Sequence, residues 1–156
     1  MWELEGRFKS PVFIEAATMK QYSATNGTTN ITEAQVNIPA KPDSGLTYRI
    51  RMTGTKTGAN ATMTVSLLLG ATEVITLTAD AVTASDWVAE FMLRIKDATN
   101  QKVSGFYLQD TEDPDVNYAD GTVNLGAGAA LIPRITSSHG SDVVYCEACT
   151  VEAWIK

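Results

Sequence analysis

The chain has 156 residues, of which 44% are hydrophobic and 19% are charged. This composition excludes disorder over most of the chain, and no run approaches the ~20 apolar residues that a membrane-spanning helix needs. The formal net charge is −6, and the Lys and Arg residues are scattered, with Arg49 and Arg51 only two positions apart. Nucleic-acid binding through a basic face is therefore not expected, because an acidic domain repels phosphate.

The first thirty residues lack a clean periodicity. The start, Met1 to Arg7, has no basic stretch followed by an apolar one, so we expect synthesis in a cytoplasm without a signal peptide. The two cysteines are then expected to be reduced. Residues 1–30 form either an N-terminal arm that reaches a neighbouring subunit or an edge strand of the same domain. The remaining residues, 31–156, form one domain.

Apolar residues alternate with polar ones along most of the remaining chain, which is typical of half-buried strands. In residues 86–96 the apolar Trp87, Phe91 and Ile95 fall on one face, while Glu90 and Arg94 fall on the other. Residues 62–69 and 73–78 read as a hairpin around Gly70. Predicted strands cover residues 32–38, 47–55, 62–69, 73–78, 86–96, 103–109, 121–125, 131–136 and 143–155.

Breaker-rich turns separate these strands, and residues 110–121 read as a long polar loop. No segment has convincing helical periodicity. Many short strands without intervening helices predict an all-β fold, an antiparallel β-sandwich of jelly-roll-like type.

Three features are candidates for sites of chemistry. Cys146 and Cys149 have the CxxC spacing, but strand-like flanks would point the two thiols to opposite faces unless a bulge intervenes, so buried structural thiols are favoured over a redox or metal role. His139 is the only histidine and lies in a turn-like cluster without a Gly-x-Ser-x-Gly elbow.

The segment 110–121 is the third feature. Its carboxylates could hold Ca²⁺ or form a glycosidase pair, but a solvated acidic loop is favoured over both. The carboxylates that would hold calcium are Asp110, Asp113, Asp115 and Asp120. We therefore expect no enzyme activity, no cofactor and no metal.

Exposed aromatic residues are the remaining candidates for function. Tyr118 lies in the acidic segment, and Trp2 and Trp154 lie near the two ends of the chain, where subunits often meet. Such residues could bind sugar or a partner chain. The residues expected to contact another subunit or a partner chain are Trp2, Leu4, Phe8, Phe13 and Trp154.

Three segments resemble those of small tailed-phage head decoration (cement) proteins with a jelly-roll or β-sandwich fold. They are an apolar strand ending in Ile-Pro-Ala (residues 34–40), a Tyr-Arg-Ile-Arg strand (48–55) and a Thr-rich hairpin strand (61–70). The resemblance covers residues 30 to 156. It implies a homotrimer on the capsid exterior of the virion, bound to the major capsid protein and stabilising the shell.

Two other functions remain open from the sequence. A glycan- or receptor-binding module of a phage tail fibre or baseplate would present Tyr118 beside a shallow groove. A small hydrolase using the acidic residues is the third hypothesis. Neither nucleic acid nor a membrane is expected as a partner.

Overall fold

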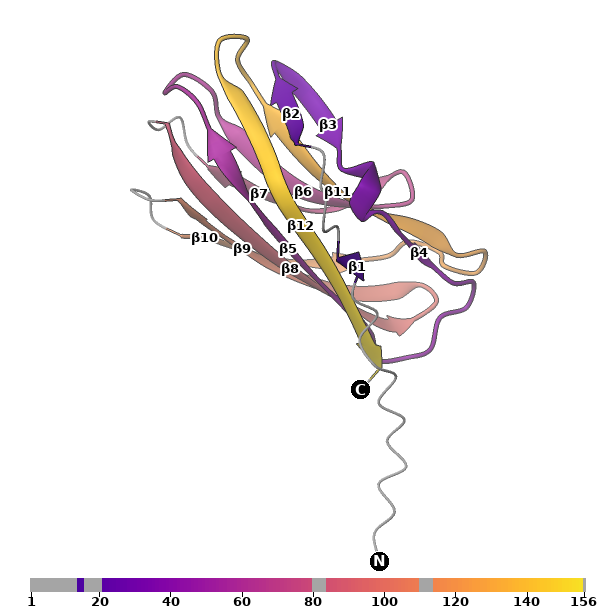
Figure 1. Ribbon diagram of the computed structural model, residues 1–156. Helices are drawn as coiled ribbons and strands as arrows, with labels where there is room; N and C mark the ends of the chain where they lie inside the picture. The colour runs from indigo at the N-terminus through magenta and orange to yellow at the C-terminus, as the bar shows by residue number, and fades with distance from the viewer. Residues whose placement is uncertain (1–13, 16–20, 80–83, 110–113, 156) are drawn as a thin grey trace, which may run out of the picture.

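The computed structural model describes residues 14–15, 21–79, 84–109 and 114–155. They form two layers of antiparallel strands (Figure 1). The seven-stranded sheet contains β1 (Ile14–Glu15), β2 (Tyr22–Thr25), β5 (Leu46–Lys56), β8 (Ser85–Asp97), β9 (Asn100–Gln109), β10 (Asp115–Gly121) and β12 (Val143–Ile155). The five-stranded sheet contains β3 (Gly27–Asn30), β4 (Val36–Ile38), β6 (Met63–Leu69), β7 (Thr72–Ala79) and β11 (Ala129–Ser137). The predicted antiparallel β-sandwich is confirmed.

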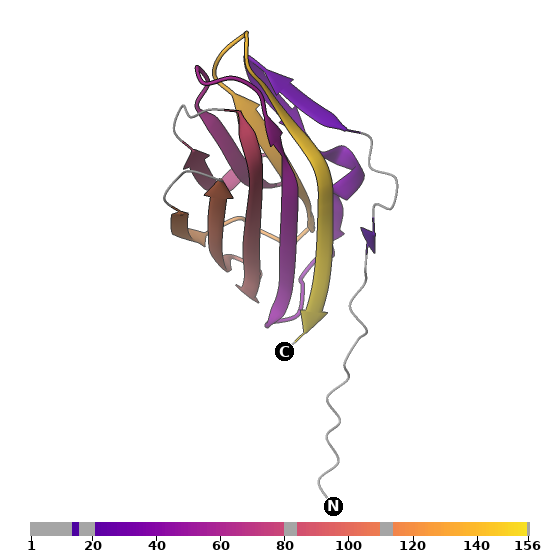
Figure 2. The ribbon, with the colours of Figure 1, turned by 60° about the vertical axis from the view of Figure 1, so that its left-hand side comes forward.

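The order of strands determines which side chains share a face. In the seven-stranded sheet the order is β12, β5, β8, β9, β10, with β1 and β2 both paired to β12 at one edge. Figure 2 shows these long strands side by side. In the five-stranded sheet β11 pairs with β6, β6 pairs with β7, and the short β3 and β4 lie along the other side of β11. The described residues include one 3-10 turn, η1 (Thr32–Ala34), and no α-helix.

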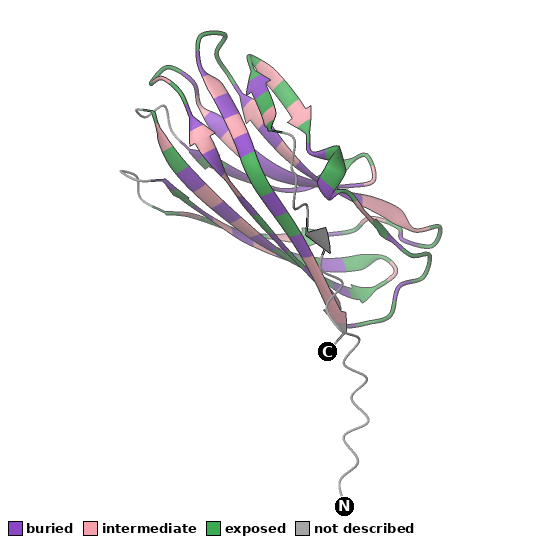
Figure 3. Cartoon of the chain, viewed as in Figure 1, coloured by how far each residue is buried: buried purple, intermediate pink, exposed green. Residues whose placement is uncertain are grey.

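Buried and exposed residues alternate along the strands (Figure 3), and the buried ones form the core between the sheets. Along β8, the predicted inward residues Trp87, Phe91 and Ile95 are all buried, and along β5 the alternate residues Tyr48, Ile50 and Met52 are buried as well. Burying a large apolar side chain contributes about 1.5–3 kcal/mol, so this alternation fixes which face of each strand meets the other sheet.

Strand β6 departs from simple alternation. The pattern predicts Ser66 and Leu68 on the solvent side, but they are 1% and 8% exposed. Arg134, on the adjacent β11, donates from Nε to the Ser66 hydroxyl at 3.1 Å, so its stem covers that position. The pairing with β7 also shifts register between Leu67 and Leu68.

The predicted loop at residues 110–121 and the predicted strand at residues 121–125 are both wrong in their bounds. Residues 115–121 form a strand within the predicted polar loop, because this edge strand pairs with β9 along its whole length and needs few apolar side chains. Residues 122–125 do not continue it. The buried Gln101 side chain instead donates to the Val123 carbonyl at 3.0 Å and accepts its N–H at 3.1 Å, replacing a strand partner.

The predicted strand at residues 32–38 is also wrong in its first half. Residues 32–34 form η1, and only 36–38 pair with β11. The Tyr22 hydroxyl accepts the Glu33 N–H at 3.1 Å and lies 3.2 Å from the Thr32 hydroxyl. These bonds satisfy polar groups that a continuous strand would have paired with β11.

Residues 22–30 belong to both sheets. β2 pairs with β12, and β3 pairs with β11, so the chain passes from one layer to the other at Asn26, whose φ is +43°. Asn is one of the few residues that adopt this left-handed conformation at low cost. This segment therefore supplies an edge strand to each sheet.

Candidate functional site

The outer face of the seven-stranded sheet carries the exposed apolar side chains. Among the described residues, the large hydrophobic side chains that are exposed are Met92 (37%), Leu108 (41%), Val116 (53%) and Tyr118 (76%). They come from β8, β9 and β10, three neighbouring strands. We call these four residues the apolar strip. Scattered exposed hydrophobics need no explanation, but a cluster on one face marks a surface that contacts something else.

The strand register arranges this face in rows. One row crosses the sheet from Trp154 through Thr47, Arg94 and Lys102 to Asp120. The next row contains Glu152, Arg49, Met92, Ser104 and Tyr118. Side chains in neighbouring rows stand on the same side of the sheet, because they are two residues apart on each strand.

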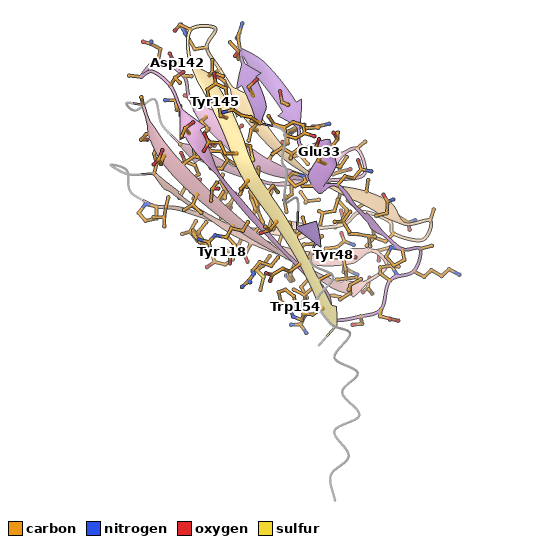
Figure 4. The ribbon with its side chains drawn as sticks, in the orientation of Figure 1. Glu33, Tyr48, Tyr118, Asp142, Tyr145 and Trp154 are labelled. Atoms are coloured by element: carbon orange, nitrogen blue, oxygen red, sulfur yellow. The ribbon has the colours of Figure 1, made fainter. Side chains whose placement is uncertain are left out.

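A groove of about 760 Å³ lies over these two rows. Its lining includes Met92, Arg94, Lys102, Tyr118, Asp120 and Trp154. Tyr118 comes from β10 and Trp154 from β12, so the two residues stand at opposite ends of this run of strands. Figure 4 places both on the outer face of the sheet. Four strand spacings of about 4.8 Å separate their strands, or roughly 19 Å. Trp154 is half-buried.

The charges in and beside the groove are unevenly paired. Arg49 donates to the Glu152 carboxylate at 2.6 Å, and Lys102 forms an ion pair with Asp120. Arg94 stands directly opposite Lys102 across β8 and β9. Among the described residues, its guanidinium has no ion pair.

Basic residues that are scattered in the sequence are brought together by the fold. Arg49, Arg51, Arg94 and Lys102 all lie on the outer face of the seven-stranded sheet.

The described carboxylates of the acidic segment do not form one cluster. Asp115 and Asp120 lie five residues apart on β10, which places them on opposite faces and roughly 16 Å apart along the strand. Asp115 accepts the Thr78 N–H at 2.8 Å. These two residues therefore do not share an ion; Asp110 and Asp113 lie outside the described residues. Within the described ranges, no three His, Cys, Asp or Glu side chains are grouped so that they could hold a metal.

The two cysteines lie on the inner side of β12. A bulge between Cys146 and Ala148 inserts one extra residue, which turns both Cys146 and Cys149 inward, 0% and 2% exposed. The strand geometry alone predicts divergent thiols, and the bulge overrides it. Both thiols are free. Burial raises the pKa of Cys146 to about 12 and raises the pKa of Cys149 as well, so both are protonated at neutral pH.

His139 lies in an exposed turn, as predicted. Its Nδ1 is 2.8 Å from the Ser141 hydroxyl, which in turn donates to the Asp142 carboxylate at 3.1 Å. In a catalytic triad the histidine lies between the serine and the carboxylate. Here the serine lies between the other two, so this arrangement is a hydrogen-bonded turn.

The predicted contact residues near the N-terminus, Trp2, Leu4, Phe8 and Phe13, lie outside the described residues. Of that predicted set, Trp154 is described, and it lines the groove. Sequence reasoning missed Met92, Arg94 and Lys102 as site residues. The available signal was that Arg94 and Lys102 flank a short polar turn, which would pair them across a hairpin.

Known proteins offer few matches to this chain. No protein-family model and no curated protein matches it. One solved chain, from "Structure of infectious bursal disease virus Gt strain", aligns with 95% of this chain at a TM-score of 0.32 and 15% identity. The alignment covers 42% of that solved chain, so this chain spans less than half of its length. A likeness at this level transfers no function. The described part of the chain also contains no helix long and apolar enough to span a bilayer.

Proposed function

We propose that this protein is a structural virion protein, a capsid decoration protein that binds the outer capsid surface and stabilises the shell. The observation that carries the proposal is the apolar strip on the outer face of the seven-stranded sheet. Charged residues flank the strip, among them Arg51 and Glu90. An apolar centre with a polar rim is the composition of a protein–protein interface.

A decoration protein acts by contact, and it can do so through a modest interface on each copy. A protein that binds only the assembled shell shifts the equilibrium toward it by mass action. Repetition over a symmetric lattice, and assembly into a homotrimer, multiply a modest interface into a high overall affinity. The proposed partner is the major capsid protein.

The test combines solution mass with shell binding. We expect light scattering over a dilution series to give three times the 16.8 kDa chain mass, and we expect the protein to co-sediment with shells assembled from the major capsid protein of the same virus. Val116→Lys should weaken co-sedimentation at least tenfold, since it places a charge in the apolar strip. Thr64→Lys, on the outward side of β6, is the control. Wild-type protein that stays in the supernatant would overturn the proposal.

A glycan- or receptor-binding module of a tail fibre or baseplate is a second candidate. The observation that favours it is the groove, whose lining includes Tyr118 and Trp154. Aromatic rings with a few polar groups between them are typical of small-ligand sites. Binding of oligosaccharides on a glycan array, lost in Tyr118→Ala, would support this function, and an array without signal would count against it.

A further inference from the structure

We infer that the groove over β8 and β9 binds a saccharide that carries a carboxylate, with Arg94 and Lys102 as the groups that hold it. This inference rests on the second candidate function above and gives it a ligand class. Arg94 on β8 faces another cation, Lys102, on β9. Like charges directly opposite on neighbouring strands destabilise a sheet, and Asp120 pairs with Lys102 and not with Arg94.

Arg49, a neighbouring cation on the same face, has an ion-pair partner, whereas Arg94 has none among the described residues. Arg49 lies one row away on the same face, and Glu152 holds its guanidinium at 2.6 Å. Arg94, in contrast, is exposed and has no ion pair within the described parts of the chain. A carboxylate in the groove would supply the missing partner, because guanidinium binds carboxylate through two parallel N–H bonds.

The groove carries a positive charge on an acidic protein. Arg94 and Lys102 against Asp120 leave it one positive charge, whereas the whole chain has a formal net charge of −6. An extended polyanion would meet repulsion from the rest of the surface. A short ligand with a single acidic group would not, so charge complementarity favours a small acidic molecule over nucleic acid.

The apolar part of the groove favours a sugar as the carrier of that carboxylate. Tyr118 is 76% exposed, and it offers a ring face beside Met92 and the charged row. The residue opposite Tyr118 on β9 is Ser104, a small residue that leaves the tyrosine ring uncovered on that side. The volume of about 760 Å³ lies in the range of ligand sites, roughly 300–1,000 Å³. A saccharide can stack on the ring while its carboxylate reaches Arg94.

The experiment is calorimetric titration of the full chain with matched acidic and neutral probes. The acidic probes are sialyllactose and galacturonate, each with one carboxylate; the neutral probes are lactose and galactose, and tetraglutamate serves as an acidic peptide. We expect at least one acidic saccharide to bind about tenfold or more tightly than its neutral counterpart. Arg94→Gln should remove that preference, whereas Lys96→Gln, two residues along the same strand face and outside the groove, should retain it.

Each outcome decides the inference. Acid-selective binding lost in Arg94→Gln and weakened in Tyr118→Ala supports it. Equal binding of acidic and neutral sugars overturns the acidic ligand class but keeps the second candidate function. Tighter binding of tetraglutamate than of any sugar points to an acidic protein segment and overturns it. An absence of binding of every saccharide probe to the wild-type chain at about 10 mM overturns the inference and counts against the second candidate function, which the glycan array tests separately.

Discussion

The buried carboxylate of Asp142 holds the loop at Asn60 and Ala61 in place through hydrogen bonds to its backbone. It is 2% exposed, at the opposite end of β12 from Trp154 (Figure 4). It accepts the backbone N–H of Asn60 at 2.5 Å and of Ala61 at 2.8 Å, and the hydroxyl of Ser141. Burial alone would raise the pKa of Asp142, but these hydrogen bonds outweigh it and hold the pKa below its usual value of 3.8.

The lowered pKa of Asp142 makes stability depend on pH in a definite direction. The folded state favours the ionised carboxylate, so its contribution is complete above the unfolded pKa of 3.8 and is lost as the pH falls through the lower folded value. We expect Asp142→Asn to lower the melting temperature by several degrees at pH 7 and to flatten the loss of stability on acidification. Thermal unfolding between pH 7 and pH 2 measures both, with the exposed Asp86→Asn as control. An unchanged acid slope would contradict this role.

At the scale of elements, β10 protects an edge of the other sheet. β7 is the last strand of the five-stranded sheet, and its outer backbone groups would be open to pairing with another chain. Asp115 accepts the Thr78 N–H at 2.8 Å, and Asn117 donates to the Thr76 carbonyl at 2.9 Å. Side chains from one sheet thus occupy backbone groups of the other and close the sandwich along this side.

Removing these two side chains should both destabilise and expose the edge. We expect the double variant Asp115→Ala, Asn117→Ala to lose about 1–3 kcal/mol of unfolding free energy, since each hydrogen bond contributes about 0.5–1.5 kcal/mol. It should also self-associate more at high concentration, measured by sedimentation velocity. Asp120→Ala is the matched control, because it removes an exposed ion pair from the other face of the same strand. Equal losses in the two proteins would argue against edge protection.

The sequence predicts some of these elements well and others poorly, for physical reasons. Strands with one buried face, such as β5 and β8, carry an alternation that the core imposes, and their inward residues follow directly from it. β10 is an edge strand with the reverse distribution: Val116 and Tyr118 face outward, whereas Asp115 and Asn117 reach toward the other sheet, so it lacks the pattern of an apolar inner face. The bulge after Cys146 cannot be inferred from local preference either, since it depends on the pairing of β12 with β5.

At the scale of the whole molecule, the candidate site is a product of strand order. Trp154, Arg94 and Tyr118 are far apart in the chain and line one groove only because β12, β5, β8, β9 and β10 lie in that order across one sheet. A period-two pattern in the sequence identifies which residues of a strand face outward, but it does not identify which strands lie beside that strand in the sheet. The grouping of cations on this face is therefore beyond the reach of composition and charge counts.

The outer face divides into two regions that single changes should separate. Leu108 and Val116 belong to the apolar strip and are not part of the groove lining, whereas Arg94 lines the groove and is not part of the strip. If the strip binds the capsid and the groove binds an acidic saccharide, Leu108→Lys should weaken co-sedimentation with shells at least tenfold and leave saccharide affinity within about twofold. Arg94→Gln should show the reverse. Loss of both activities in either variant, with melting temperatures unchanged, would mean that one continuous surface binds both the shell and the saccharide. The two activities would then compete, because Met92 and Tyr118 lie in both regions.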